Sequence, residues 1–147
     1  MTENRRSRVA VNPPSMFMPK GYSHGVRVEG NCIVFVSGQS GRKSDGSLLS
    51  DIVAQASQAL KNVRTTVEAF GGNMNDLGKL TILVTDMREY LSRSKELAAL
   101  FRASFGETLP AMSLAEVSRF MDEEVKIEVD GFAMVSEDGS GRCPGGC

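Results

Sequence analysis

The stretch from Asp51 to Gly72, "DIVAQASQALKNVRTTVEAFGG", decides the fold because its apolar residues follow the period of an amphipathic helix. They recur at intervals of three and four and form one face over about five turns of 3.6 residues. These residues are Ile52, Ala56, Ala59, Leu60, Val63, Val67 and Phe70. Ser50 or Asp51 is suited to cap the start, and Gly71-Gly72 provides a left-handed stop. The stretch therefore predicts a helix that buries one face.

Segments rich in the β-branched and apolar residues typical of strands lie on both sides of this helix in the sequence. Upstream, "VRV" (Val26–Val28) and "IVFV" (Ile33–Val36) flank the turn residues Glu29-Gly30-Asn31, a pattern that predicts a β-hairpin. Downstream, "KLTILV" (Lys79–Val84) returns to β-branched and apolar residues. The other strands expected are "LPAMSLAEV" (Leu109–Val117), "VKIEVDGFAMV" (Val125–Val135) and a short one near Val9–Val11.

A second helix is expected from about Arg88 or Ser92 to Phe105, with Gly106 ending it. Its apolar stripe consists of Leu97, Leu100, Phe101 and Phe105. The element order β-β-α-β-α-β-β predicts an α+β fold, in which both helices pack on one face of a mixed sheet.

The last strand indicates what lies on the other sheet face. Val125, Ile127 and Val129 share one side of the strand, and Lys126, Glu128 and Asp130 share the other. Glu128 is therefore expected to point away from the helix-packed core. Because a bare sheet face exposes a larger apolar patch than monomers usually show, this face is expected to pair with another subunit.

Composition favours one cytoplasmic domain of 147 residues. The net charge of -1 gives no overall positive potential to attract nucleic acid or an anionic membrane, so neither is an expected partner. No apolar run approaches the ~20 residues needed to span a bilayer, and the polar N-terminus lacks a signal-peptide core. We expect a flexible tail at 1–8, which includes the basic run Arg5-Arg6-Ser7-Arg8, a folded domain at 9–135 and a disordered tail at 136–147.

Three cysteines occur, Cys32 before a strand and Cys143 and Cys147 in the tail. An odd count in a reducing compartment argues against a structural disulfide. His24 is the single histidine, and no second cysteine pair completes a tetrahedral set, so we expect no metal and no cofactor.

The chain resembles the Rid family, the YjgF or reactive intermediate/imine deaminase proteins formerly named endoribonuclease L-PSP, over nearly all of residues 16–135. The matching pieces are "KGYSHGV" (Lys20–Val26), "VFVSGQSG" (Val34–Gly41), "QASQALKNVRTTVEAFGG" (Gln55–Gly72), "KLTILVTDMREY" (Lys79–Tyr90) and "LPAMSLAEVSRF…VKIEV" (Leu109–Phe120, Val125–Val129). The resemblance implies a chorismate-mutase-like fold and a homotrimer whose sheets form a central barrel, with three clefts between subunits. It also implies cofactor-free hydrolysis of reactive enamines or imines, since an imine carbon is already electrophilic.

The resemblance also assigns residues to the cleft. Tyr22 occupies the position of the tyrosine that contacts a planar substrate, and Ser37 and Gly38 match a strand-end pair whose backbone faces the ligand. Glu128 matches the glutamate proposed to activate water. Each residue has a plainer interpretation: Glu128 as a solvated strand residue, Tyr22 as edge packing, Ser37-Gly38 as a strand end. His24 is interpreted as a loop or interface residue.

Three substrate-binding positions depart from the family pattern. Met112 stands where an arginine clamps the substrate carboxylate, Leu114 replaces a common cysteine and Ser94 a common asparagine. Loss of a charged clamp costs roughly 2–5 kcal/mol of binding. Met112 then forms an apolar cleft wall or a trimer contact. The arginines available to replace the clamp are Arg27, Arg93, Arg102 and Arg119.

The sequence leaves three candidate functions for the protein. The first is a Rid-type hydrolase of an enamine, imine or related conjugated metabolite that depends less on a carboxylate clamp. The second is a trimer that binds a small metabolite without chemistry. The third is a ribonuclease, which near-neutral charge, a single histidine and the lack of a basic-aromatic stripe disfavour.

Overall fold

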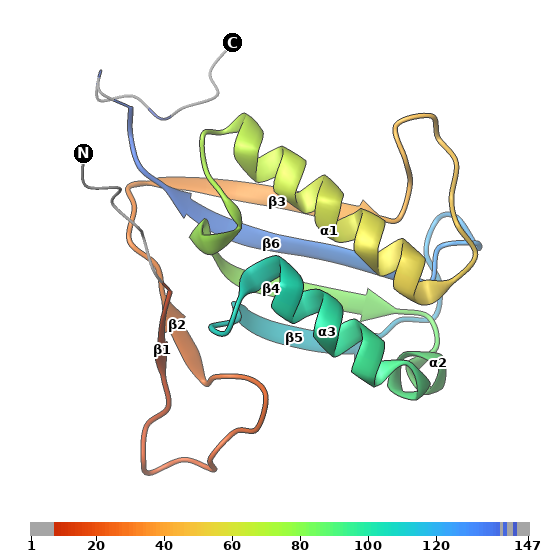
Figure 1. Cartoon of the computed structure of the whole chain (residues 1–147), viewed down its shortest axis with the longest axis horizontal. Helices are drawn as coiled ribbons and strands as arrows, with labels where there is room; N and C mark the ends of the chain where they lie inside the picture. Colours follow the sequence, from red (N-terminus) through yellow and green to blue (C-terminus); the bar gives the residue numbers. More distant parts are fainter. Residues whose placement is uncertain (1–7, 139, 141–142, 144–147) are drawn as a thin grey trace.

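The computed structural model describes residues 8–138, 140 and 143. A four-stranded mixed sheet with strand order β3-β6-β4-β5 forms its centre (Figure 1). The strands are β3 (Cys32–Ser40), β6 (Ile127–Val135), β4 (Leu77–Val84) and β5 (Ala111–Glu116). β4 and β5 are parallel, and the other pairings are antiparallel. The predicted α+β class with a mixed sheet is thus confirmed.

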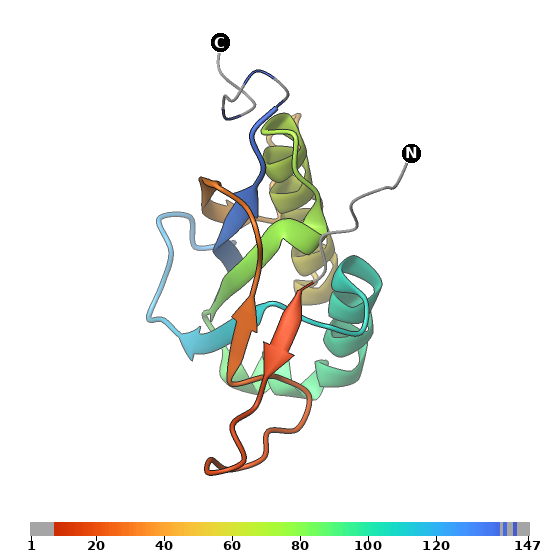
Figure 2. The ribbon, with the colours of Figure 1, turned by 90° about the vertical axis from the view of Figure 1, so that its left-hand side faces the viewer.

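Both long helices cover the same face of this sheet (Figure 2). Helix α1 (Ile52–Ala69) packs against β3 and β6, and α3 (Ser94–Phe105) lies beside it. Between α1 and β4 runs a single 3-10 turn, η1 (Met74–Asp76). The core fills the layer between helices and sheet and is almost entirely aliphatic, with Phe101 and Phe105 at the α3 side.

Helix α1 forms as its sequence predicts. The Asp51 side chain accepts a hydrogen bond from the Ala54 amide at 3.0 Å, and Gly71 adopts a φ of 72°, which ends the helix. The predicted face is buried except at its last member, Phe70, which lies at the C-cap and is exposed. Gln55 is also buried, because its amide group bonds three backbone groups of the neighbouring loops.

The second helix is divided into α2 (Met87–Ser92) and α3. Asp86 caps α2 by accepting from the Arg88 and Glu89 amides, and Arg93 separates the two helices. Arg93 donates to Asp51 at 2.6 Å, which ties this break to the start of α1. Gly106, with a φ of 77°, ends α3 as expected.

The predicted hairpin of Val26–Val28 with Ile33–Val36 is wrong. Strand β2 (Gly25–Arg27) pairs with β1 (Val9–Val11), and β3 pairs with β6. Between β2 and β3 the chain passes tightly against the end of β6, where a Cβ at Gly30 would lie 2.8 Å from the Val135 carbonyl oxygen. The long apolar strand β6 offers β3 a central partner, whereas β2 is only three residues long.

The expected N-terminal tail of residues 1–8 is too long, because Arg8 is buried. Its side chain is only 7% exposed and donates to the carbonyl oxygens of Met74 at 2.6 Å, Thr108 at 2.7 Å and Phe105 at 2.5 Å. Burial lowers the pKa of the Arg8 guanidinium, and the nearby Asp76 carboxylate opposes that shift. Arg8 therefore belongs to the folded domain; residues 1–7 lie outside the described residues.

The cysteine prediction also needs correction, because Cys32 and Cys143 form a disulfide. The register pairs Cys32 with Val135, the last residue of β6, so the chain leaving β6 passes Cys32 at once. Without knowledge of the β3–β6 pairing, nothing in the sequence indicates that two cysteines 111 residues apart are joined. Cys147 and most of the predicted disordered tail, residues 139, 141–142 and 144–147, lie outside the described residues.

The sheet face opposite the helices carries large apolar side chains. Phe35 on β3 is 70% exposed and Phe132 on β6 is 46% exposed, and their rings meet edge to face at 5.4 Å. Ile33 is exposed beside them. Within the part of the chain that the structure describes, no helix covers this face and no helix is long and apolar enough to cross a membrane.

Candidate functional site

Glu128 and Gly38 are in direct contact on the open sheet face. Glu128 lies on β6, whose buried residues Ile127 and Val129 face the helices, so its side chain points the other way, as predicted. A Cβ built at Gly38 would overlap Glu128 Oε1 and lie 2.6 Å from its Cδ. Glycine is therefore required at position 38 for the carboxylate to lie where it does.

A β-bulge brings this contact about. The β3–β6 register shifts between Val36 and Gln39, so that Ser37 and Gly38 stand opposite the single residue Asp130. Such bulges redirect the chain locally and occur often beside active sites. The Gln39 side-chain amide donates to the Ser37 carbonyl at 3.1 Å, which holds the bulge in place. Gln39 therefore supports the bulge of the candidate site, and the sequence patterns did not predict this role.

The Glu128 carboxylate remains available for chemistry. Its cross-strand neighbours are Ser40 on β3 and Leu83 on β4, and it is half-buried among them. Among the described residues, no hydrogen bond or ion pair engages its oxygens. A carboxylate whose backbone is held in the sheet and whose oxygens no described protein donor engages can accept a proton from a water molecule or orient it.

Met112 and Leu114 lie on the other side of the sheet in the same chain. They pair with Leu80 and Ile82 of β4, both buried under the helices, and register partners in a sheet share a face. Met112 is half-buried against the core, and Leu114 is exposed on the edge strand. Within one chain, Met112 and Leu114 therefore lie on the opposite side of the sheet from Glu128.

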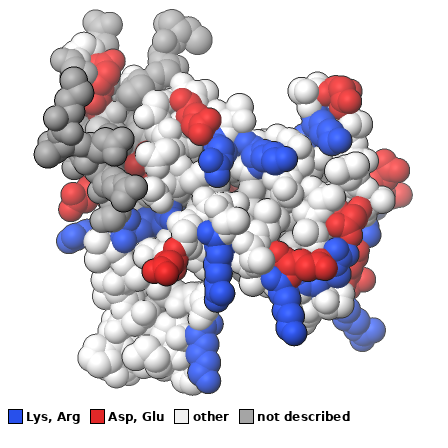
Figure 3. All heavy atoms as spheres, in the orientation of Figure 1, with Lys and Arg blue, Asp and Glu red and all other residues white. Residues whose placement is uncertain are grey.

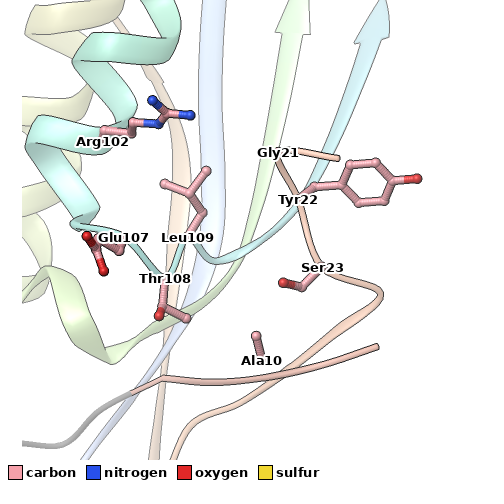
Figure 4. Close-up of a pocket in the computed structure, with 8 residues that line it drawn as sticks. All are labelled: Ala10, Gly21, Tyr22, Ser23, Arg102, Glu107, Thr108 and Leu109. Carbon is pink, nitrogen blue, oxygen red and sulfur yellow. The ribbon is translucent and has the colours of Figure 1, made fainter. Parts of the chain in front are cut away.

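Tyr22 lies in the loop between β1 and β2, at the rim of a pocket. This pocket, of about 220 Å³, separates the β1–β2 hairpin from the turn between α3 and β5 (Figure 4). Its lining residues are Ala10, Gly21, Tyr22, Ser23, Arg102, Glu107, Thr108 and Leu109. The Tyr22 ring points away from the pocket toward solvent, and it is exposed.

Ser94 lies apart from the other predicted residues. It is the exposed first residue of α3, next to the break at Arg93, whereas Met112 is at the opposite, starting end of β5. His24 is a loop residue, as interpreted: its Nε2 lies 2.6 Å from the Phe17 carbonyl oxygen, and its amide donates to Asn12.

The structure separates the four arginines suggested as replacements for the clamp. Arg93 is engaged by Asp51 and Glu96, and Arg27 pairs with Glu29 at 3.7 Å. Arg119 lies exposed in the loop before β6. Arg102 alone among them lines the pocket that Tyr22 borders.

On the face seen in Figure 3, Lys and Arg side chains are interspersed with Asp and Glu over the helices. The described part of this face has no large field of one sign. On this face the described charges therefore form no basic patch of the kind that binds nucleic acid.

The fold and the Glu128–Gly38 contact define an α+β protein with a carboxylate site on the open face of its sheet. The family described as Endoribonuclease L-PSP matches residues 16–135, and the chain belongs to this family, also called Rid or YjgF.

Known relatives agree with this assignment. A protein of Escherichia coli strain K12 named 2-iminobutanoate/2-iminopropanoate deaminase is 36% identical over 124 residues, which span 84% of this chain and 92% of that protein. A RutC family protein of Haemophilus influenzae is 32% identical over 103 residues, 69% of this chain and 78% of its own. The crystal structure of the YjgF gene product of E. coli superposes with a TM-score of 0.62 at 35% identity, covering 85% and 95% of the two chains.

A second solved structure supports the fold alone. The Rid family protein YyfB of Yersinia pestis superposes with a TM-score of 0.76 over 88% of this chain and 99% of its own, at 24% identity.

Proposed function

We propose that this protein is a cofactor-independent hydrolase of reactive enamines or imines. The observation that carries the proposal is the Glu128 carboxylate, which the Gly38 bulge accommodates on the open sheet face and which no described side chain engages. The deaminase name of the E. coli relative supports the same reaction class.

In the proposed reaction, Glu128 accepts a proton from water while the water oxygen attacks the imine carbon. The electron pair of the C=N bond moves to nitrogen, which takes up the proton that Glu128 has accepted, and this regenerates the carboxylate. The resulting carbinolamine then collapses to a carbonyl compound and ammonia. Glu128 is suited to this role because its backbone is paired with β3 and β4 on both sides and its side chain points out of the core.

The proposed cleft is assembled from more than one copy of the chain. Glu128, Ser37 and Gly38 lie on the open face, and Tyr22, Met112 and Leu114 lie elsewhere on the same chain. A homotrimer joined through the open faces would cover Phe35 and Phe132 and could place the two groups of residues in one cleft. Ser94, exposed and remote from both groups, is the weakest member of the proposed site.

The reaction is tested by trapping the imine that an amino-acid oxidase releases, using semicarbazide. The wild-type protein is expected to lower the trapped imine, and Glu128→Gln is expected to lose at least about 100-fold in rate, the scale of general-base catalysis. Glu68→Gln, on the exposed end of α1, is the matched control. Equal rates for Glu128→Gln and the wild type would contradict the proposal.

The proposed substrate depends less on a carboxylate clamp, because Met112 is neutral and packs toward the core. Met112→Arg should raise turnover of amino-acid imines, and Met112→Leu should leave it unchanged. Wild-type activity on those imines that already equals that of the E. coli relative would show that position 112 does not set the substrate.

A further inference from the structure

The pocket between the β1–β2 hairpin and the α3–β5 turn carries two opposite charges in one small space. Arg102, in the last turn of α3, and Glu107, just beyond Gly106, both line it. They form no ion pair with each other or with another described residue. In Figure 4 the Arg102 guanidinium extends toward the Gly21 segment across the pocket. Neither charge is therefore neutralised by a described partner.

The remaining lining gives the pocket a polar and an apolar part. Ser23 and Thr108 contribute hydroxyl groups, and Leu109 and Ala10 contribute aliphatic surface. A volume of about 220 Å³ is below the ~300–1,000 Å³ typical of sites for drug-sized ligands. The pocket thus suits a small molecule with a short aliphatic part.

Both walls of the pocket are held by hydrogen bonds. On one wall, the buried Arg8 bonds the Phe105 and Thr108 carbonyls on either side of Glu107. On the other, Asn12 accepts from the His24 amide, which follows Ser23 directly. Such support reduces the ordering cost of binding.

We infer that this pocket binds a small zwitterion with a short aliphatic side chain, an α-amino acid, with the carboxylate on Arg102 and the protonated nitrogen on Glu107. A guanidinium holds a carboxylate with two parallel hydrogen bonds. The C-terminal end of α3 adds a partial negative charge on the side of Glu107, which favours a cation. A phosphate fits less well, because Glu107 repels a multiply charged anion.

This site is separate from the Glu128 carboxylate and stands whether or not the chain hydrolyses imines. It shares only the hairpin loop with the proposed cleft, since the Tyr22 ring points away from the pocket. An occupant would contact Gly21 and Ser23 on either side of Tyr22 and so fix the loop that carries this ring.

The test is an amide NMR titration of the full chain with L-alanine, propanoate and ethylamine. The latter two each lack one charged group of L-alanine. L-Alanine should bind at least about tenfold more tightly than either, the scale of a hydrogen bond to a charged group. The shifted amides should include Ser23, Glu107 and Thr108.

Two variants test the contributions of the two charges one at a time. Arg102→Gln should abolish the advantage of L-alanine over ethylamine, and Glu107→Gln should abolish its advantage over propanoate. Arg88→Gln, which removes an exposed arginine on α2, is the control and should bind L-alanine as the wild type does. Unchanged amide spectra outside the pocket show that each variant is folded.

Three results would overturn the inference. They are L-alanine binding no tighter than its two fragments, wild-type affinity in Arg102→Gln, and shifts that map away from the pocket. None depends on turnover, so this site can fail while the proposed hydrolysis holds, and the reverse.

Discussion

At the scale of the residue, Arg8 shows how one buried side chain can stabilise two distant segments. Its guanidinium spans η1 and the α3–β5 turn through carbonyls more than 60 residues away in sequence. Planar guanidinium groups can satisfy several acceptors at once, which an ammonium cannot do in the same geometry. The sequence placed Arg8 in a basic run, and composition alone could not distinguish it from its exposed neighbours.

Arg8→Met should therefore lower the free energy of unfolding by about 3 kcal/mol, because buried carbonyls lose their donor and Asp76 loses a nearby cation. Urea denaturation measures this change. Arg64→Met, at an exposed position on α1, should change the free energy by less than about 0.5 kcal/mol. Similar values for the two variants would contradict the structural role of Arg8.

At the scale of the element, the amphipathic helix and the strand alternation were predictable because both follow from local periods. Helix α1 and the outward direction of Glu128 are confirmed on that basis. The β1–β2 pairing was not predictable, because strand partners depend on contacts distant in sequence. The bulge at Ser37-Gly38 likewise arises only when β3 meets β6, although its glycine was already a candidate.

The start of α1 yields a prediction with a pH dependence. The hydrogen bonds from Arg93 and from the Ala54 amide hold the pKa of the Asp51 carboxyl below its ordinary value of 3.8. Asp51→Ala should cost about 1 kcal/mol of stability at neutral pH, the usual value of an N-cap. Asp51→Asn keeps a capping oxygen and should recover part of that loss.

The sign of the pH effect follows from the lowered pKa. The charged Asp51 contributes fully above the ordinary pKa and loses its contribution as pH falls through the lower folded-state value. The difference in melting temperature between wild type and Asp51→Ala should therefore shrink only in strong acid. A difference that shrinks near neutral pH would contradict this assignment.

At the scale of the whole molecule, the proposed trimer would use the open sheet face to complete the proposed site. Strand alternation correctly predicted that Glu128 points away from the helix-packed core. The grouping of Glu128 with Met112 and Tyr22 in one cleft came only from the family resemblance. In one chain these residues lie on different faces. Alternation along a strand gives its faces, but it cannot show which surfaces of two copies meet.

Phe35→Lys should prevent self-association, because it places a charge in the exposed apolar patch of β3 and β6. Light scattering should give three times the 15.9 kDa chain mass for the wild type and a single chain mass for the variant. Leu91→Lys, at an apolar position of α2 that is 58% exposed, should remain a trimer. A monomeric wild type would exclude the shared cleft.

The most direct measurement of the central claim is the imine-trapping rate of Gly38→Ala against Gly25→Ala. The new Cβ at position 38 overlaps Glu128 Oε1, whereas at position 25 it meets nothing within 4 Å. Displacing the carboxylate by about 1 Å should reduce the rate of Gly38→Ala by roughly 100-fold. Gly25→Ala should retain the wild-type rate. Full activity in Gly38→Ala would contradict the role given to Glu128.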